Sequence, residues 1–164
     1  MKKIWIILLS IILVIVLIPT VLLLSLWGYK HQNSPFATLP DYEMKEYYTS
    51  GGFQDFTDYA EYSYDGITPQ DLESSKYFTI TTVEDVEEIL LHINNFKKRV
   101  KACGGELMEN YDFDESIVTD GDYFYIKSKH GEPIGQGIYN KFDNYTVYYF
   151  DVDKQILYYF HSNI

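Results

Sequence analysis

The segment YTVYYFDVDKQILYYFHS, residues 145–162, contains two runs of β-branched and aromatic residues around Asp153-Lys154. This pattern predicts a β-hairpin with strands over residues 145–152 and 155–162. One face of this hairpin carries Tyr148, Phe150, Val152, Leu157 and Tyr159, and the other carries Val147, Tyr149, Ile156, Tyr158 and Phe160. Both faces are therefore apolar or aromatic, whereas a sheet with one wet face alternates apolar and polar residues. We expect both faces to be covered.

One face of the hairpin is expected to pack on a long helix. The other face meets either residues 41–75 of the same chain or a protein partner, because tyrosine is enriched where proteins bind proteins. The sequence therefore suggests a candidate interaction surface formed by Tyr123, Tyr125, Tyr149 and Tyr158.

The long helix is predicted between a cap at Thr81 or Thr82 and the two glycines at 104–105. Thr81 or Thr82 can cap its first turn, with Glu84 or Asp85 placed three residues later as in a capping box. Apolar residues then recur every three or four positions, at Val83, Val86, Ile89, Leu90, Ile93, Phe96 and Val100. The two glycines at 104–105 are expected to end the helix.

Further strands are predicted over residues 77–81, 115–119 and 122–128. Residues 41–75 form an acidic, tyrosine-rich stretch in which we expect one or two short helices. The sum is one α+β domain, with the long helix packed on a three- to five-stranded antiparallel sheet. This arrangement is similar in shape to the cystatin fold, an analogy that carries no activity.

Residues 4–27 contain no charged side chain and are long enough to span a bilayer as a helix. A cleaved signal peptide is the alternative, but its apolar core is roughly 7–15 residues long and ends at a small-residue site that is not found here. Lys2 and Lys3 precede the span and only Lys30 follows it closely, which favours a cytoplasmic N-terminus. The predicted organisation is an anchor over 1–28, a tether over 29–40 and an extracytoplasmic domain over 41–164.

The composition excludes two classes of protein. Phe, Trp and Tyr make up 18% of the 164 residues, far more aromatic surface than a disordered acidic tail carries. The 24 acidic and 13 basic residues give a net charge of −11, which argues against a nucleic-acid partner. Residues 29–164 hold all 24 acids and 11 of the bases, a balance of −13.

No motif indicates a metal, a cofactor or a catalytic residue. Cys103 continues the apolar stripe and is expected to be a buried small hydrophobe. The acidic cluster at Asp112, Asp114, Glu115, Asp120 and Asp122 lacks the EF-hand glycine, so it is either a solvated loop or a weak calcium site. The four histidines, His31, His92, His130 and His161, show no metal-ligand spacing.

Several phrases, GFQDFTDY (52–59), YDFD (111–114), KFDNY (141–145) and the ending LYYFHSNI (157–164), resemble an uncharacterised family of small membrane-tethered proteins of low-GC Gram-positive bacteria. The resemblance covers the outer domain. It implies a bacterial envelope setting and supplies no activity, cofactor or site residue.

Three hypotheses for function are compatible with these patterns. The first is a non-catalytic protein-binding module, one form of which is an immunity or inhibitor protein. The second is an envelope hydrolase that uses Asp112, Asp114 or Asp122 as acid and base, which requires two carboxylates roughly 5–10 Å apart in a cleft. The third, association through the membrane span itself, lacks the expected small-residue pattern.

Overall fold

The computed structural model describes residues 15–21, 34–52, 55–129 and 141–164. The chain divides into two compact units, Met1–Thr38 and Leu39–Ile164. In the first unit, residues 15–21 are helical and Pro35–Thr38 (η1) forms a 3₁₀ turn within the predicted tether. Most of the predicted anchor lies outside the described residues. Among the residues that are described, no helix has both the length and the apolar character that crossing a membrane requires.

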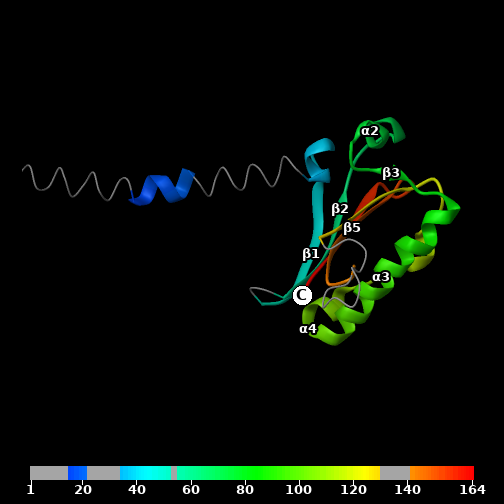
Figure 1. The fold of residues 1–164 in the computed structure, drawn as a ribbon. Helices are drawn as coiled ribbons and strands as arrows, with labels where there is room; N and C mark the ends of the chain where they lie inside the picture. The colour runs from blue at the N-terminus through cyan, green and yellow to red at the C-terminus, as the bar shows by residue number, and fades with distance from the viewer. Residues whose placement is uncertain (1–14, 22–33, 53–54, 130–140) are drawn as a thin grey trace, which may run out of the picture. The chain divides into compact units, whose positions relative to one another are not determined.

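The second unit is an α+β domain built around one antiparallel sheet with strand order β1-β2-β6-β5-β4-β3 (Figure 1). The strands are β1 (Glu43–Gly51), β2 (Phe56–Ser63), β3 (Thr79–Ile80), β4 (Tyr123–Ser128), β5 (Asn144–Asp151) and β6 (Ile156–Asn163). The helices are α2 (Pro69–Ser74), α3 (Val83–Cys103) and α4 (Gly105–Asn110), with a 3₁₀ turn η2 (Glu115–Ile117). The predicted α+β class is confirmed, although the sheet has six strands rather than three to five.

The long helix α3 begins and ends close to where the sequence predicts. The Thr82 backbone N–H donates to Asp85 Oδ2 over 2.9 Å, which completes the capping box. At the other end Gly104 has φ +65° and its N–H donates to the Val100 carbonyl. Ile89, Ile93, Phe96 and Val100 are buried in the core, as expected. Val83 is an exception at 75% exposed, because the first turn precedes the buried stripe.

The hairpin of β5 and β6 has the predicted register, with Tyr149 opposite Tyr158 and Asp151 opposite Ile156. Tyr149 and Tyr158 belong to the face that packs on α3, which we call the helix-side face. Its strongly buried residues from these two strands are Tyr145, Val147, Tyr149, Tyr158 and Phe160. Burying an apolar side chain of this size contributes about 1.5–3 kcal/mol, so these five residues are a substantial part of the core.

The segment 41–75 contains one short helix, α2, in keeping with the one or two that we expected. Most of the segment is instead the antiparallel hairpin of β1 and β2, which the prediction missed. Gly51 has φ +120°, a conformation that L side chains rarely adopt, so the double glycine belongs to the hairpin turn. β2 is buried along both faces between β1 and β6, and such strands lack the alternation by which a strand is recognised.

Two further predictions need correction. The strand expected over residues 115–119 is the 3₁₀ turn η2, where Asp114 accepts a hydrogen bond from the Ser116 N–H and so favours a turn. The strand expected over residues 77–81 is reduced to the two residues of β3. The strand expected over residues 122–128 is confirmed as β4.

The opposite face of the sheet carries a continuous row of aromatic rings. Successive ring centroids lie 5.3 Å apart from Tyr77 to Tyr125, 5.9 Å to Tyr148, 5.3 Å to Tyr159 and 6.1 Å to His161. Such pairs add about 0.5–1.5 kcal/mol each beyond area burial. The row accounts for a part of the high tyrosine content through packing within the domain.

The end of the segment 41–75 reaches this opposite face. The Tyr64 ring lies 5.8 Å from the Phe150 ring, and the Tyr123 hydroxyl donates to Glu73 Oε1 of α2 over 3.1 Å. Residues 41–75 therefore cover this face at one end of the sheet only. The rest of the segment does not lie across the face, because β1 and β2 are themselves strands of the sheet.

His161 makes stability depend on pH between about 5 and 7. Burial lowers the pKa of its imidazole, more strongly than the Asp58 charge raises it. The unfolded chain then binds a proton more readily than the folded one, so stability is complete above the unfolded pKa and falls as the pH drops below it. We expect urea unfolding of residues 39–164 to show a lower stability at pH 5 than at pH 7.

The matched variant is His161→Asn, which removes the titrating ring but keeps a polar group beside Thr146 Oγ1, 2.7 Å from His161 Nδ1 in the native chain. Its stability should change little over the same pH interval. An equal loss in the variant would contradict the assignment to His161.

Candidate functional site

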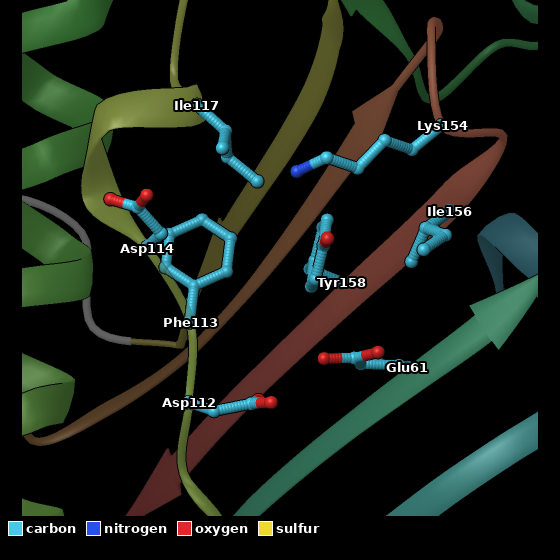
Figure 2. Close-up of a pocket in the computed structure, with 8 residues that line it drawn as sticks. All are labelled: Glu61, Asp112, Phe113, Asp114, Ile117, Lys154, Ile156 and Tyr158. Carbon is cyan, nitrogen blue, oxygen red and sulfur yellow. The ribbon is translucent and has the colours of Figure 1, made fainter.

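A pocket lies on the helix-side face, where the chain returns from α4 across β2 and β6. It has a volume of about 240 Å³. Eight residues line it: Glu61, Asp112, Phe113, Asp114, Ile117, Lys154, Ile156 and Tyr158 (Figure 2). Its volume suits one side chain or one small group rather than a folded segment.

The floor of the pocket is set by strand pairing. Glu61 of β2 lies opposite Tyr158 of β6 in the antiparallel register. The segment 111–117 forms the facing wall, where the Phe113 ring meets the Tyr158 ring edge-on at 4.8 Å. Figure 2 shows Tyr158 at the centre, with Lys154 on one side and Glu61 and Asp112 on the other.

Two carboxylates of the pocket share one hydroxyl. The Tyr59 hydroxyl lies 2.8 Å from Glu61 Oε1, to which it donates, and 3.5 Å from Asp112 Oδ1. Glu61 is only 4% exposed, whereas Asp112 is exposed. Burial, followed by the hydrogen bond to Glu61, holds the pKa of Tyr59 far above its usual value, so Tyr59 remains a donor.

Tyr158 is buried, yet its hydroxyl is not used by the fold. The side chain is 6% exposed and makes no hydrogen bond within the part of the chain that the structure describes. Burial raises its pKa, and the charges of Glu61, Asp151 and Asp112 raise it further. The hydroxyl is therefore neutral and available to a group in the pocket.

The lysine at the rim is already paired. Lys154 Nζ lies 3.4 Å from Asp151 Oδ2, and the Lys154 backbone N–H donates to Asp151 Oδ1 over 2.9 Å. Of the lining side chains, Glu61, Asp112 and Asp114 are acidic and only Lys154 is basic. The electrostatic balance of the pocket is negative.

The predicted surface of Tyr123, Tyr125, Tyr149 and Tyr158 is not a single exposed patch. Tyr149 and Tyr158 lie on the helix-side face and are 0% and 6% exposed. Tyr123 and Tyr125 lie on the opposite face, where Tyr123 is 2% exposed and only Tyr125 is partly accessible. The prediction is wrong because the four tyrosines are divided between the two faces, and the long helix covers the face of Tyr149 and Tyr158.

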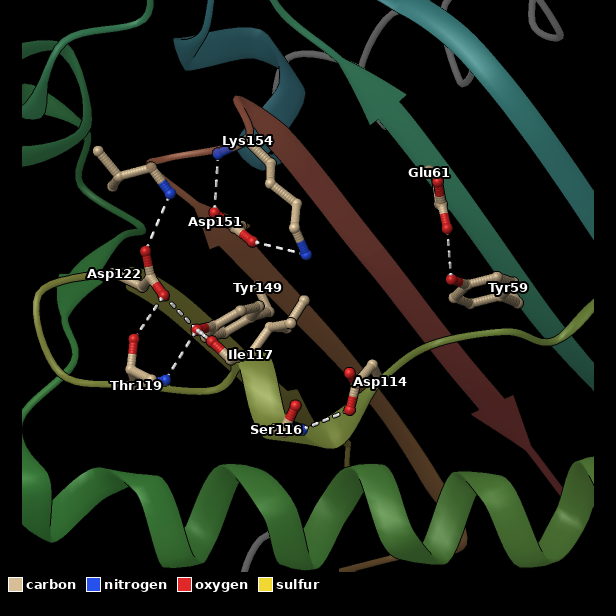
Figure 3. A network of polar contacts seen from close by, with 11 residues as sticks. Tyr59, Glu61, Asp114, Ser116, Ile117, Thr119, Asp122, Tyr149, Asp151 and Lys154 are labelled. Atoms are coloured by element: carbon tan, nitrogen blue, oxygen red, sulfur yellow. Dashed lines mark hydrogen bonds and ion pairs between the residues drawn. The ribbon is translucent and has the colours of Figure 1, made fainter.

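The residues of the predicted acidic cluster lie apart and make different contacts. Asp112 and Asp114 line the pocket, Glu115 pairs with Lys97, and Asp120 is exposed. Asp122 is buried and accepts hydrogen bonds from the Tyr149 and Thr119 hydroxyls, as Figure 3 shows. It also accepts a hydrogen bond from the Val152 N–H. The five residues therefore do not converge, and no group of three potential ligands that could hold a metal ion occurs among the described residues.

Cys103 and the histidines occupy other places. Cys103 is exposed, contrary to expectation, because the last residue of α3 lies beyond the buried stripe. Its Sγ lies 3.9 Å from Thr57 Oγ1. His92 is buried against Tyr145 and Phe142 in the core, whereas His31 and His130 lie outside the described residues.

The sequence reasoning missed Glu61, Tyr59 and Lys154 as parts of a site. Assigning residues 56–63 as a strand would have placed Tyr59 and Glu61 on one face, since alternate residues of a strand share a face. Their meeting with Tyr158 depends on the pairing of β2 with β6, for which the sequence carries no local signal. Lys154 was recognised only as a turn residue.

Comparison of the chain with protein-family models, curated proteins and solved structures found no match. The question of function therefore rests on the chemistry of the pocket and the organisation of the chain.

Asp122 anchors the segment 117–122 to β5, and its loss should be costly. Replacing Asp122 with Ala leaves the buried Tyr149 hydroxyl and the Val152 N–H without this acceptor, so we expect a destabilisation of about 2–3 kcal/mol in urea unfolding. The matched control, Asp120→Ala, removes an exposed carboxylate and should cost under about 0.5 kcal/mol. Equal effects of the two substitutions would contradict this role.

Proposed function

We propose that the chain is a single-pass membrane protein with a cytoplasmic N-terminus, and that residues 29–164 lie outside the cytoplasm. The uncharged run over residues 4–27 supports the anchor, and Lys2 and Lys3 support the orientation. The described portion of this run, residues 15–21, is helical, and Ile15, Val16, Leu17, Ile18 and Val21 are 50–64% exposed. A helix with exposed apolar side chains suits a lipid surrounding.

The outer domain is, in this proposal, a non-catalytic protein-binding module. The observation that carries it is the pocket between β2, β6 and the segment 111–117, in which the Tyr158 hydroxyl has no partner among the described residues. Other polar groups of the same region, such as Asp122, are used by hydrogen bonds of the fold. An unused hydroxyl in a pocket lined by carboxylates is a group with which a binding module can recognise a ligand.

The charge of the domain supports a basic partner. The balance of −13 over residues 29–164 would accelerate encounter with a positively charged protein and repel anionic lipid headgroups. An immunity or inhibitor protein, tethered where an envelope-acting toxin or enzyme works, is one form of such a module.

An envelope hydrolase is the second candidate, and one observation favours it. Glu61 and Asp112 both lie within hydrogen-bonding reach of the Tyr59 hydroxyl, so the pocket contains a close pair of carboxylates. The hydrolase hypothesis expects turnover of envelope polysaccharide by the full chain that Glu61→Gln abolishes. The binding module expects no turnover by either protein.

The proposed topology can be tested at the native cysteine. Cys103 is exposed, and it is the single cysteine of the chain. An impermeant maleimide should therefore label the full-length protein on intact cells, and Cys103→Ala should remove the signal. Labelling that requires lysis of the cells would place the domain in the cytoplasm.

Capture of a partner can be tested at the pocket rim. A photo-crosslinking phenylalanine analogue replaces Asp112 in the full-length chain, and the same analogue replaces Leu91, which is 42% exposed on α3, as the control. Irradiation of native membranes should give one abundant adduct from position 112 and none from position 91. Absence of any adduct from position 112 would count against a binding module.

A further inference from the structure

We propose that the pocket binds the guanidinium group of an arginine side chain supplied by the protein partner. This inference rests on the proposed binding function and names the chemistry that the pocket recognises. It uses three features of the pocket: its charge, its aromatic wall and the available Tyr158 hydroxyl.

Charge selects a cation. Glu61, Asp112 and Asp114 line the pocket, and Lys154, the basic residue at the rim, already lies 3.4 Å from Asp151. Glu61 is 96% buried and accepts a hydrogen bond from the Tyr59 hydroxyl, so its carboxylate is held in place at the pocket. Three carboxylates beside one paired lysine favour a positively charged ligand over an anionic one.

The aromatic wall favours a flat cation. Phe113 and Tyr158 both line the pocket, and their rings meet edge to face with their centroids 4.8 Å apart (Figure 2). A guanidinium is planar and stacks on aromatic rings more readily than the compact, strongly hydrated ammonium of lysine. An arginine can therefore combine stacking with hydrogen bonds to carboxylates in a pocket of about 240 Å³.

The Tyr158 hydroxyl is the second, independent indication of a ligand. Tyr158 is 94% buried and lines the pocket. Its hydroxyl has no hydrogen-bond partner within the described residues. The Tyr158 oxygen is not one of the fully buried polar atoms that lack a partner, so it is open to the pocket, where a donor from a ligand can reach it. The five N–H donors of a guanidinium can reach this oxygen and a carboxylate together.

The test uses the full-length chain in detergent micelles with labelled isoleucine δ-methyl groups. Ile117 and Ile156 line the pocket, and Ile93 in the core reports on general effects. The probes are N-acetyl-arginine amide, N-acetyl-lysine amide and N-acetyl-citrulline amide, the last being the uncharged analogue of arginine. We expect the arginine probe to shift the Ile117 and Ile156 resonances, with weaker binding of the lysine probe and about tenfold weaker binding of citrulline.

Three variants localise the effect. Asp112→Asn, which removes one exposed charge, should weaken the arginine probe about tenfold, and Tyr158→Phe should weaken it about threefold. Asp120→Asn removes a neighbouring exposed charge outside the pocket and should leave the affinity unchanged. The unshifted Ile93 resonance verifies that each variant is folded.

The outcomes separate this inference from the proposed function. Equal affinity for arginine and citrulline, or no shift at Ile117 and Ile156, overturns the arginine site, even where crosslinking at position 112 still captures a protein. Arginine binding without any crosslinked protein overturns the assignment to a protein partner. Specific arginine binding together with a crosslinked partner supports both.

Discussion

The antiparallel pairing of β2 with β6 is the contact on which the rest of the domain depends. It joins the hairpin of β1 and β2 to the meander of β4, β5 and β6, and so makes one sheet from two local units. The register places Tyr59 opposite Phe160 in the core and Glu61 opposite Tyr158 in the pocket. A slip by one residue would move each of these side chains to the other face. Core and candidate site are therefore fixed by the same hydrogen-bonded ladder.

The acidic residues of the domain fall into two groups with different physical roles. Asp85 and Asp122 accept backbone and hydroxyl hydrogen bonds that hold a helix terminus and a turn. Asp112 and Asp114 lie exposed at the rim of a pocket whose floor contains a buried carboxylate, Glu61. The negative charge of the chain is thus partly a means of building turns and partly a property of one binding surface. A simple count of acids does not distinguish these roles.

The sequence patterns predicted those features of the fold that depend on interactions between residues close in sequence. The capping box and apolar stripe of α3 and the register of the β5–β6 hairpin follow from residues close in sequence, and they were predicted correctly. The hairpin of β1 and β2 was mistaken for helix, because β2 is buried on both faces and its aromatic spacing resembles a helix face in part. Of the pocket, Asp112, Asp114 and Tyr158 were noticed for other reasons. Glu61 was missed because its neighbour Tyr158 lies 97 positions further along the chain.

The central pairing also determines when the domain can be completed. Phe56 at the start of β2 lies opposite Asn163, so a strand made early finds its partner only after almost the whole domain has been synthesised. Contacts of such long sequence separation have a high entropic cost of loop closure and slow folding. Until β6 arrives, the growing chain presents the unpaired edge of a tyrosine-rich hairpin, a surface prone to association. We therefore expect the nascent chain to need chaperones until β6 has been synthesised.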